Sequence, residues 1–187
     1  MHALVILISL LLACFGTLAE SQTSQQQNFD TVKIYQAALE TNGEAPRGID
    51  PEALQLSRKL ADAQHTLIVV DQELLVVGHA LGAFVTGRNP GKDRERRLFV
   101  EQEMIPTLFQ NFEVFRDLFA ISVADTFSVA DLKGMASQGD LANQKLDIEK
   151  SKAAAVKFHN AALVLGGWLL EKLTADPGNR LKPYGLK

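Results

Sequence analysis

DPEALQLSRKLADAQHTLIVVDQELLVVGHALGAFV, residues 50–85, is the stretch that decides the fold. Its apolar residues recur in alternating steps of four and three, which places them in one stripe along an α-helix and excludes a strand. The members of this stripe are Leu56, Leu60, Ala63, Leu67, Val70, Leu74, Val77, Leu81 and Phe84. Between Leu67 and Val77 other apolar residues lie off the stripe, so we expect neighbouring helices to surround this helix. The sequence predicts an all-α protein, a single bundle of five to seven helices around this long central helix.

Two signals mark the ends of this central helix. Asp50 can cap the first turn through its carboxylate, and Pro51 suits the first helical position, where its missing N–H costs nothing. The run Gly-Arg-Asn-Pro-Gly at residues 87–91 combines helix breakers and ends the helix. Basic residues outnumber acidic ones over residues 92–97, which we interpret as the solvated first turn of the next helix. A phosphate or anionic-lipid contact there is the alternative.

Length and composition are those of one globular domain. The chain has 187 residues, of which 47% are hydrophobic and 22% are charged. Its formal net charge is −3. A general nucleic-acid binder needs a basic face that displaces the counterions of the phosphates, so we expect no nucleic-acid partner.

The first residues are typical of an export signal. Residues 3–13 are apolar with one exception, a length that is short for crossing a bilayer but right for a signal peptide. Small residues suitable for cleavage end at Ala19. We therefore predict a signal peptide at residues 1–19 and a periplasmic or secreted mature protein. Residues 20–28 are polar and without pattern, so we predict a disordered spacer there.

Cys14, the only cysteine, leaves a second route to the cell envelope open. It follows Leu-Leu-Ala at residues 11–13, and this run resembles the lipobox of bacterial lipoproteins, in which the thiol is lipidated. Lipidation would anchor the protein to a membrane, with the spacer as its tether. Cleavage after Ala19 is the preferred interpretation. In either case the mature chain forms no internal disulfide, so its apolar core must hold the fold.

Further helical patterns complete the predicted domain, residues 29–176. Helices are predicted from Phe29 to Leu39, across the Phe-rich residues 98–127, after a capping box of Ser128 and Asp131, and from Leu141, capped by Asp140, to Leu173. Pro106 is expected to cause a break or kink of the Phe-rich helix near Met104 to Ile105. The Phe-rich segment could line an apolar pocket, although plain core is the preferred interpretation. Residues 177–187 are predicted to be a loose tail.

Three short motifs resemble a known family. In chain order they are Met104-Ile105-Pro106, Phe127-Ser128-x-x-Asp131-Leu132 and Gln144-Lys145-Leu146. Over residues 98–173 this order resembles a bacterial exported all-helical family catalogued as domain of unknown function 2059. Members of that family usually carry an aromatic pair and a Ser-Pro-x-Gly turn after the Phe-Ser segment, and this chain has neither. The resemblance implies an exported helical bundle and brings no catalytic residue with it.

The sequence contains no recognisable catalytic motif. It has no paired histidines at metal-ligand spacing, no glycine-rich phosphate loop and no nucleophile elbow. We therefore predict no catalytic, metal-binding or cofactor-binding residues. Gly78 and Gly82 in the central helix, and Gly166 and Gly167 in the last helix, are interpreted as sites of close helix packing.

One titratable pair is predicted. On a helical wheel Asp71 falls inside the apolar sector of the central helix, and His159 falls beside Ala155 and Ala162 in the last helix. A carboxylate on an apolar face must find a partner or stay protonated, because burying its charge alone is too costly. We therefore hypothesise that Asp71 and His159 meet in a buried polar spot. The alternative places Asp71 at the edge of solvent or beside a lysine or arginine.

Three functions stay open at this point. We expect a non-catalytic protein-binding or interaction module whose partner is unknown. A carrier of an apolar ligand or lipid between helices, and an enzyme with an unrecognised polar site, are the alternatives. A pocket with convergent titratable groups would favour the enzyme, whereas an exposed apolar patch would favour a partner surface.

Overall fold

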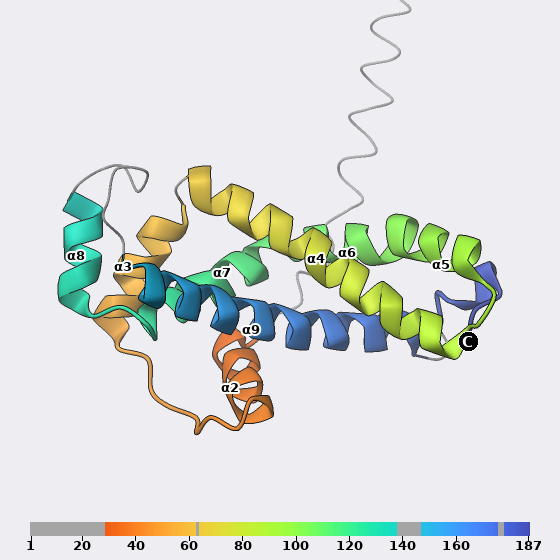
Figure 1. Cartoon of the computed structure of the whole chain (residues 1–187), viewed down its shortest axis with the longest axis horizontal. Coiled ribbons are helices and arrows are strands. Elements are labelled where there is room, and N and C mark those ends of the chain that lie inside the picture. The colour runs from red at the N-terminus through yellow and green to blue at the C-terminus, as the bar shows by residue number, and fades with distance from the viewer. Residues whose placement is uncertain (1–28, 63, 138–146, 176–177) are drawn as a thin grey trace, which may run out of the picture.

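The structure is a computed structural model that describes residues 29–62, 64–137, 147–175 and 178–187, and Figure 1 shows these parts as helices joined by loops. The helices are α2 (Thr31–Thr41), α3 (Pro51–Ala61), α4 (Gln64–Arg88), α5 (Asp93–Phe99), the π-helical turn η1 (Val100–Met104), α6 (Ile105–Gln110), α7 (Phe112–Ala124), α8 (Val129–Ser137), α9 (Ile148–Thr174) and the short 3-10 helix η3 (Lys182–Tyr184). Because α5, η1 and α6 follow one another without a break, the described residues form a bundle of seven main helices. The predicted all-α fold is confirmed. The predicted signal peptide, the spacer, Cys14 and the Asp140 cap lie outside the described residues.

The prediction of one central helix at residues 50–85 is wrong, because the chain forms two helices there, α3 and α4. α3 ends at Ala61. The hydroxyl of Thr66 then donates to the carbonyl of Leu60 at 3.1 Å and so satisfies one of the acceptors at the end of α3. α3 packs on α7 and α8, whereas α4 packs on α9 and α6. Periodicity could not locate the break because the apolar stripe continues across it.

α4 lies on the outside of the bundle, where it crosses α9 (Figure 1). Its inward side chains, which include Leu74 and Val77, are fully buried. Its outward side chains are exposed: Ile68 by 47%, Leu75 by 43% and Val76 by 50%. The expectation that neighbours surround this helix is therefore wrong, since the helices that contact α4 cover only one side of it.

α7 and α9 form the centre of the bundle instead. α7 contacts α2, α3, α4 and α9, and α9 also contacts α2, α4 and α6. Their contribution to the main core includes Phe115, Leu118, Ile121, Phe158, Ala162 and Leu165. A smaller apolar cluster, which includes Phe127 and Leu132, joins α3 and α8 to the start of α9.

Side-chain caps fix several helix ends. Asp50 caps α3 as predicted, with its Oδ1 accepting from two backbone N–H groups at 2.8 and 3.0 Å. Ser128 and Asp131 form the predicted capping box: the Asp131 N–H donates to Ser128 Oγ at 3.2 Å, and the Ser128 N–H donates to Asp131 Oδ2 at 3.1 Å. α9 begins at Ile148 rather than at Leu141, because the backbone of the preceding Asp147 is extended and its carboxylate caps the helix.

The chain from α5 to α6 contains a π turn where a break or kink was predicted. The Ile105 N–H donates to the carbonyl of Val100, five residues back, and Pro106 follows with no N–H of its own. The turn directs Val100 and Ile105 to the same neighbour, α4. A methyl group added to Gly82 would lie 2.8 Å from Val100 Cγ2, and one added to Gly78 would lie 3.0 Å from Ile105 Cγ1.

The described part of the tail is packed, so the prediction that residues 177–187 are loose is wrong. Leu181 and Leu186 are buried in the main core. The side chain of Asn89 donates to the carbonyl of Lys187 at 3.0 Å and accepts from its N–H at 2.7 Å. The two leucines follow neither a helical nor a strand period, so the sequence pattern gives no sign of their burial.

Candidate functional site

The predicted pair of Asp71 and His159 does not form. His159 Nδ1 lies 2.6 Å from Glu73 Oε1, so the histidine of α9 pairs with a different carboxylate of α4. Asp71 is exposed. Leu75, four residues on and on the same side of α4, is also exposed, by 43%. The apolar sector of α4 is wider than its buried sector, which explains the error.

The four glycines that were interpreted as close-packing sites differ in their surroundings. A methyl group added to Gly166 would lie 2.6 Å from Val77 Cγ1, so α9 approaches α4 closely at this point. Gly78 and Gly82 face the α5–α6 segment rather than α9. Gly167 faces open space, since a methyl group added there would meet nothing within 4 Å. The packing interpretation is therefore wrong for Gly167.

An apolar pocket of about 330 Å³ lies where α3, α4, α7, α8 and α9 meet. Its wall is formed by Leu60, Thr66, Val69, Glu73, Phe119, Val123, Phe127, Met135, Ser151, Ala154, Ala155 and Phe158. Phe119 and Phe158 meet edge to face within this wall, with ring centroids 5.4 Å apart. The Phe-rich segment therefore divides between two roles, because Phe115 is core whereas Phe119 and Phe127 line the pocket. A pocket of this size accommodates a small molecule.

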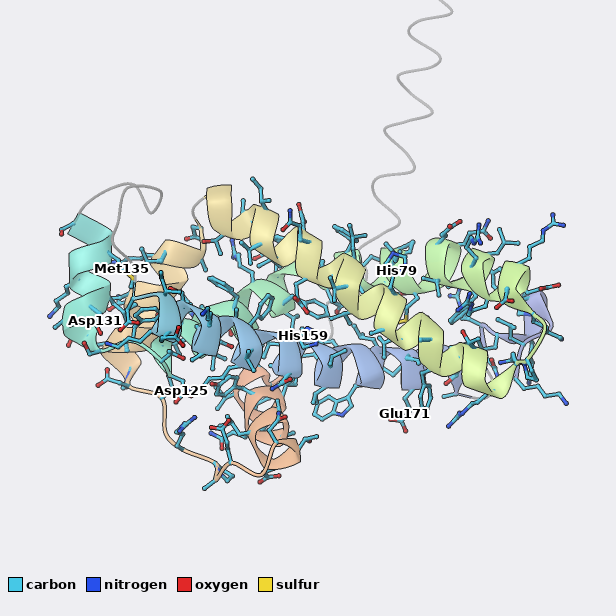
Figure 2. All side chains as sticks on the ribbon, in the orientation of Figure 1. His79, Asp125, Asp131, Met135, His159 and Glu171 are labelled. Carbon is cyan, nitrogen blue, oxygen red and sulfur yellow. The ribbon has the colours of Figure 1, made fainter. Side chains whose placement is uncertain are left out.

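Glu73 is the one charged residue among those that line this pocket. Its side chain is 17% exposed, and that of its partner His159 is 39% exposed. An ionised carboxylate can only accept hydrogen bonds, so with Glu73 ionised the hydrogen of this contact belongs to His159 Nδ1. Figure 2 shows His159 on α9, near the crossing with α4. The sequence offered a signal for Glu73 that was missed: it stands three residues after Val70 and four before Val77, both members of the buried stripe.

Asp125, which follows α7 directly, is a carboxylate with a buried side chain that sequence reasoning also missed. It accepts from the Tyr35 hydroxyl at 2.7 Å, and its oxygens lie 2.7 Å from Lys157 Nζ and 2.8 Å from Arg47 Nε. Burial, reinforced by the hydrogen bond to Asp125 and its charge, raises the pKa of Tyr35, so the phenol stays protonated and continues to donate. Because its partners come from α2, the α2–α3 loop and α9, we assign Asp125 a structural role.

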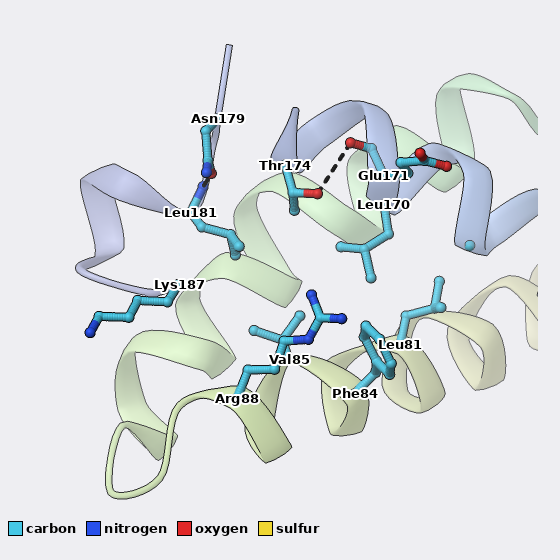
Figure 3. Close-up of a pocket in the computed structure, with 11 residues that line it drawn as sticks. Leu81, Phe84, Val85, Arg88, Leu170, Glu171, Thr174, Asn179, Leu181 and Lys187 are labelled. Carbon is cyan, nitrogen blue, oxygen red and sulfur yellow. Dashed lines mark hydrogen bonds between the residues drawn. The ribbon is translucent and has the colours of Figure 1, made fainter. Parts of the chain in front are cut away.

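A second hollow, of about 480 Å³, opens between the ends of α4 and α9 (Figure 3). Leu81, Phe84 and Leu170 supply its apolar side. The guanidinium of Arg88 lies 4.5 Å from the centre of the Phe84 ring and points into the hollow. Since the wall also contains the carboxylate of Glu171, it presents charges of both signs to a ligand.

The exposed side of α4 is an apolar surface, which we call the α4 outer face and define as Ile68, Leu75, Val76, His79 and Ala83. Next to it, Arg96, Arg97 and Glu101 line a hollow of about 310 Å³ together with His79. By length and composition alone, α4 and α9 could each cross a membrane, a test that core helices of soluble proteins also pass.

The described residues hold no group of three His, Cys, Asp or Glu side chains that could bind a metal ion. The chain matches no family model, no curated protein and no solved structure. The apolar pocket and the α4 outer face are therefore the two features from which a function can be argued.

Proposed function

We propose that this chain is an exported, non-catalytic binding protein that holds a small apolar ligand between its helices. The observation that carries this proposal is the pocket of about 330 Å³, whose wall is apolar apart from Thr66, Glu73 and Ser151. Protein interiors are packed like organic crystals and leave few voids larger than a water molecule. An apolar space of this size costs stability when it is unfilled, because its lining loses dispersion contacts. A bound apolar ligand would restore those contacts.

Filling the pocket from its own wall tests this proposal. Ala155 lines the pocket from α9, whereas Ala153, two residues earlier on the same helix, does not. We expect the natural protein and the Ala153→Phe variant to bind 1-octanol in isothermal titration calorimetry, and the Ala155→Phe variant to lose binding because the added ring occupies the ligand space. No heat of binding to the natural protein, or equal binding by both variants, would overturn the proposal.

The α4 outer face favours a second candidate function, protein interaction. We propose as its occupant an amphipathic helix of another protein with acidic residues beside its apolar stripe. The apolar side chains of α4 would cover that stripe, and Arg97, beside the face, would attract the acidic residues. A photo-crosslinking residue at Val76 should then capture a partner in the native envelope, whereas one at the exposed Val156 of α9 should not. Equal capture at both positions, or capture of lipid alone, would contradict this candidate.

Export itself is also part of the proposal, and the kinship with the helical family named above stays a prediction. The apolar residues 3–13 and the small residues that end at Ala19 support cleavage before Glu20. We expect the intact mass of the protein purified from cells to correspond to a chain that starts at Glu20. A mass corresponding to a lipid-modified chain that starts at Cys14 would instead make the protein membrane-anchored.

A further inference from the structure

We propose that the ligand of the apolar pocket carries an amino group and that Glu73 binds this group. The inference rests on the proposed function, since it concerns what the same pocket selects. It starts from a contrast in the pocket wall, where one carboxylate stands among apolar side chains. Such a group is costly to desolvate unless a donor faces it, so a ligand that fills the pocket must offer one.

His159 satisfies only part of the hydrogen-bonding capacity of Glu73. The contact at 2.6 Å joins His159 Nδ1 to Oε1 of the carboxylate. An ionised carboxylate accepts at both oxygens, so Oε2 can take a further donor from the ligand. An ammonium group of the ligand would both donate a hydrogen bond to Glu73 and balance its negative charge. A hydroxyl group would only donate a hydrogen bond, and a carboxylate of the ligand would be repelled.

The remaining polar groups of the wall do not favour an acidic ligand. No lysine or arginine lines the pocket. The nearby Lys150 is held by Asp131, with its Nζ 2.8 Å from Oδ2. The hydroxyl of Thr66 is used by the carbonyl of Leu60. Glu73, the partner of His159, is therefore the only acidic or basic side chain among the residues that line the pocket.

The size of the pocket limits the apolar part of the ligand. A water molecule, which has one non-hydrogen atom, takes up about 30 Å³ in the liquid. On this scale the pocket holds a molecule of roughly ten non-hydrogen atoms. A primary amine with an alkyl or arylalkyl body of about eight carbons has this size, and its apolar body would contact the rings of Phe119, Phe127 and Phe158.

Three probes of matched length separate the contribution of the amino group from that of the apolar body: octylamine, 1-octanol and octanoate. By calorimetry at neutral pH we expect octylamine to bind roughly tenfold tighter than 1-octanol, in line with a hydrogen bond to a charged group, and octanoate to bind weakest. Glu73→Gln should bring the dissociation constants of octylamine and 1-octanol within about twofold of each other. Asp71→Asn, which makes the same charge change on the exposed side of α4, should leave the tenfold preference unchanged.

The outcomes distinguish the inference from the proposed function. If none of the probes binds the natural protein, the proposed function fails and the inference fails with it. If 1-octanol binds the natural protein but not the Ala155→Phe variant, and octylamine binds no tighter than 1-octanol, the pocket stands and the role of Glu73 is overturned. The role of Glu73 is also overturned if Glu73→Gln keeps the preference for octylamine over 1-octanol. Octanoate binding that survives Ala155→Phe takes place outside the apolar pocket and counts as no binding there. Should Glu73→Gln fail to fold by circular dichroism, His159→Asn replaces it: freeing Oε1 should keep or increase the preference for octylamine, and its loss would overturn the inference.

Discussion

Replacing Asp125 with alanine is expected to lower the free energy of unfolding by about 3 to 5 kcal/mol, because it removes one partner of a buried ion pair and leaves the other uncompensated. The Asp125 side chain is only 5% exposed, and that of Lys157 is 17% exposed. The hydroxyl of Tyr35 would lose its acceptor at the same time. Urea denaturation followed by circular dichroism measures the change.

A matched exposed pair provides the control for this experiment. Lys133 Nζ lies 2.7 Å from Glu52 Oε1, and the two side chains are 60% and 55% exposed. Since exposed ion pairs contribute about 0 to 1 kcal/mol, Glu52→Ala should change stability little. Similar losses for Glu52→Ala and Asp125→Ala would contradict the structural role of Asp125.

The same cluster makes stability depend on alkaline pH. Folding raises the pKa of Tyr35 above its ordinary value of 10.0, so the unfolded chain loses this proton at a lower pH than the folded protein does. The stabilisation from the protonated phenol is therefore fully present below pH 10 and is lost as the pH rises through the folded pKa.

The second large effect is expected at Gly166. Gly166→Ala should destabilise the protein by about 1 to 3 kcal/mol, as overpacking of a closed contact does. The added methyl group would lie 2.6 Å from Val77 Cγ1, and Val77 is fully buried and branched at Cβ, so it has little freedom to move away. Thermal or urea unfolding of the variant measures the loss.

The adjacent glycine is the natural control. Gly167→Ala should stabilise the protein by about 0.5 to 1 kcal/mol, because alanine favours the helix and its methyl group would meet no neighbour within 4 Å. Two neighbouring substitutions of the same kind should therefore shift the unfolding midpoint in opposite directions. A neutral Gly166→Ala would show that α4 and α9 are less closely packed than described.

The fold class followed from the sequence because helical periodicity is a local property of the chain. Helical periodicity does not reveal which side of a uniformly apolar helix is buried, as Leu74 and Leu75 show. Both are leucines in one uniformly apolar run, yet Leu74 is fully buried and Leu75 is 43% exposed. Only the positions of the helices that pack on α4, among them α9, α6 and α7, decide between the two residues. The same ambiguity led to Asp71 as the partner of His159, where the structure has Glu73.

Contacts between segments that are distant in the sequence could not be predicted either. Asn89 and Lys187 are 98 positions apart in the chain, and no local pattern indicates their two hydrogen bonds. The contacts of Asp125 are also between distant segments, since Tyr35 comes long before α7 in the chain and Lys157 comes after it. Polar residues at isolated positions carry no period, so their pairing depends on tertiary packing that the sequence alone did not reveal.

The π turn constrains how the length of this chain can change. Gly78 and Gly82 are four residues apart, one turn of α4, whereas the side chains that fill their gaps, Val100 and Ile105, are five residues apart. Deleting one residue between 100 and 105 would give a more regular helix, yet it would rotate one of these side chains by about 100° away from its glycine. Conversely, an insertion would be tolerated there only if the glycine spacing of α4 changed with it. The spacing of the two glycines in α4 must therefore match the spacing of Val100 and Ile105. An insertion or deletion in one segment requires a compensating change in the other.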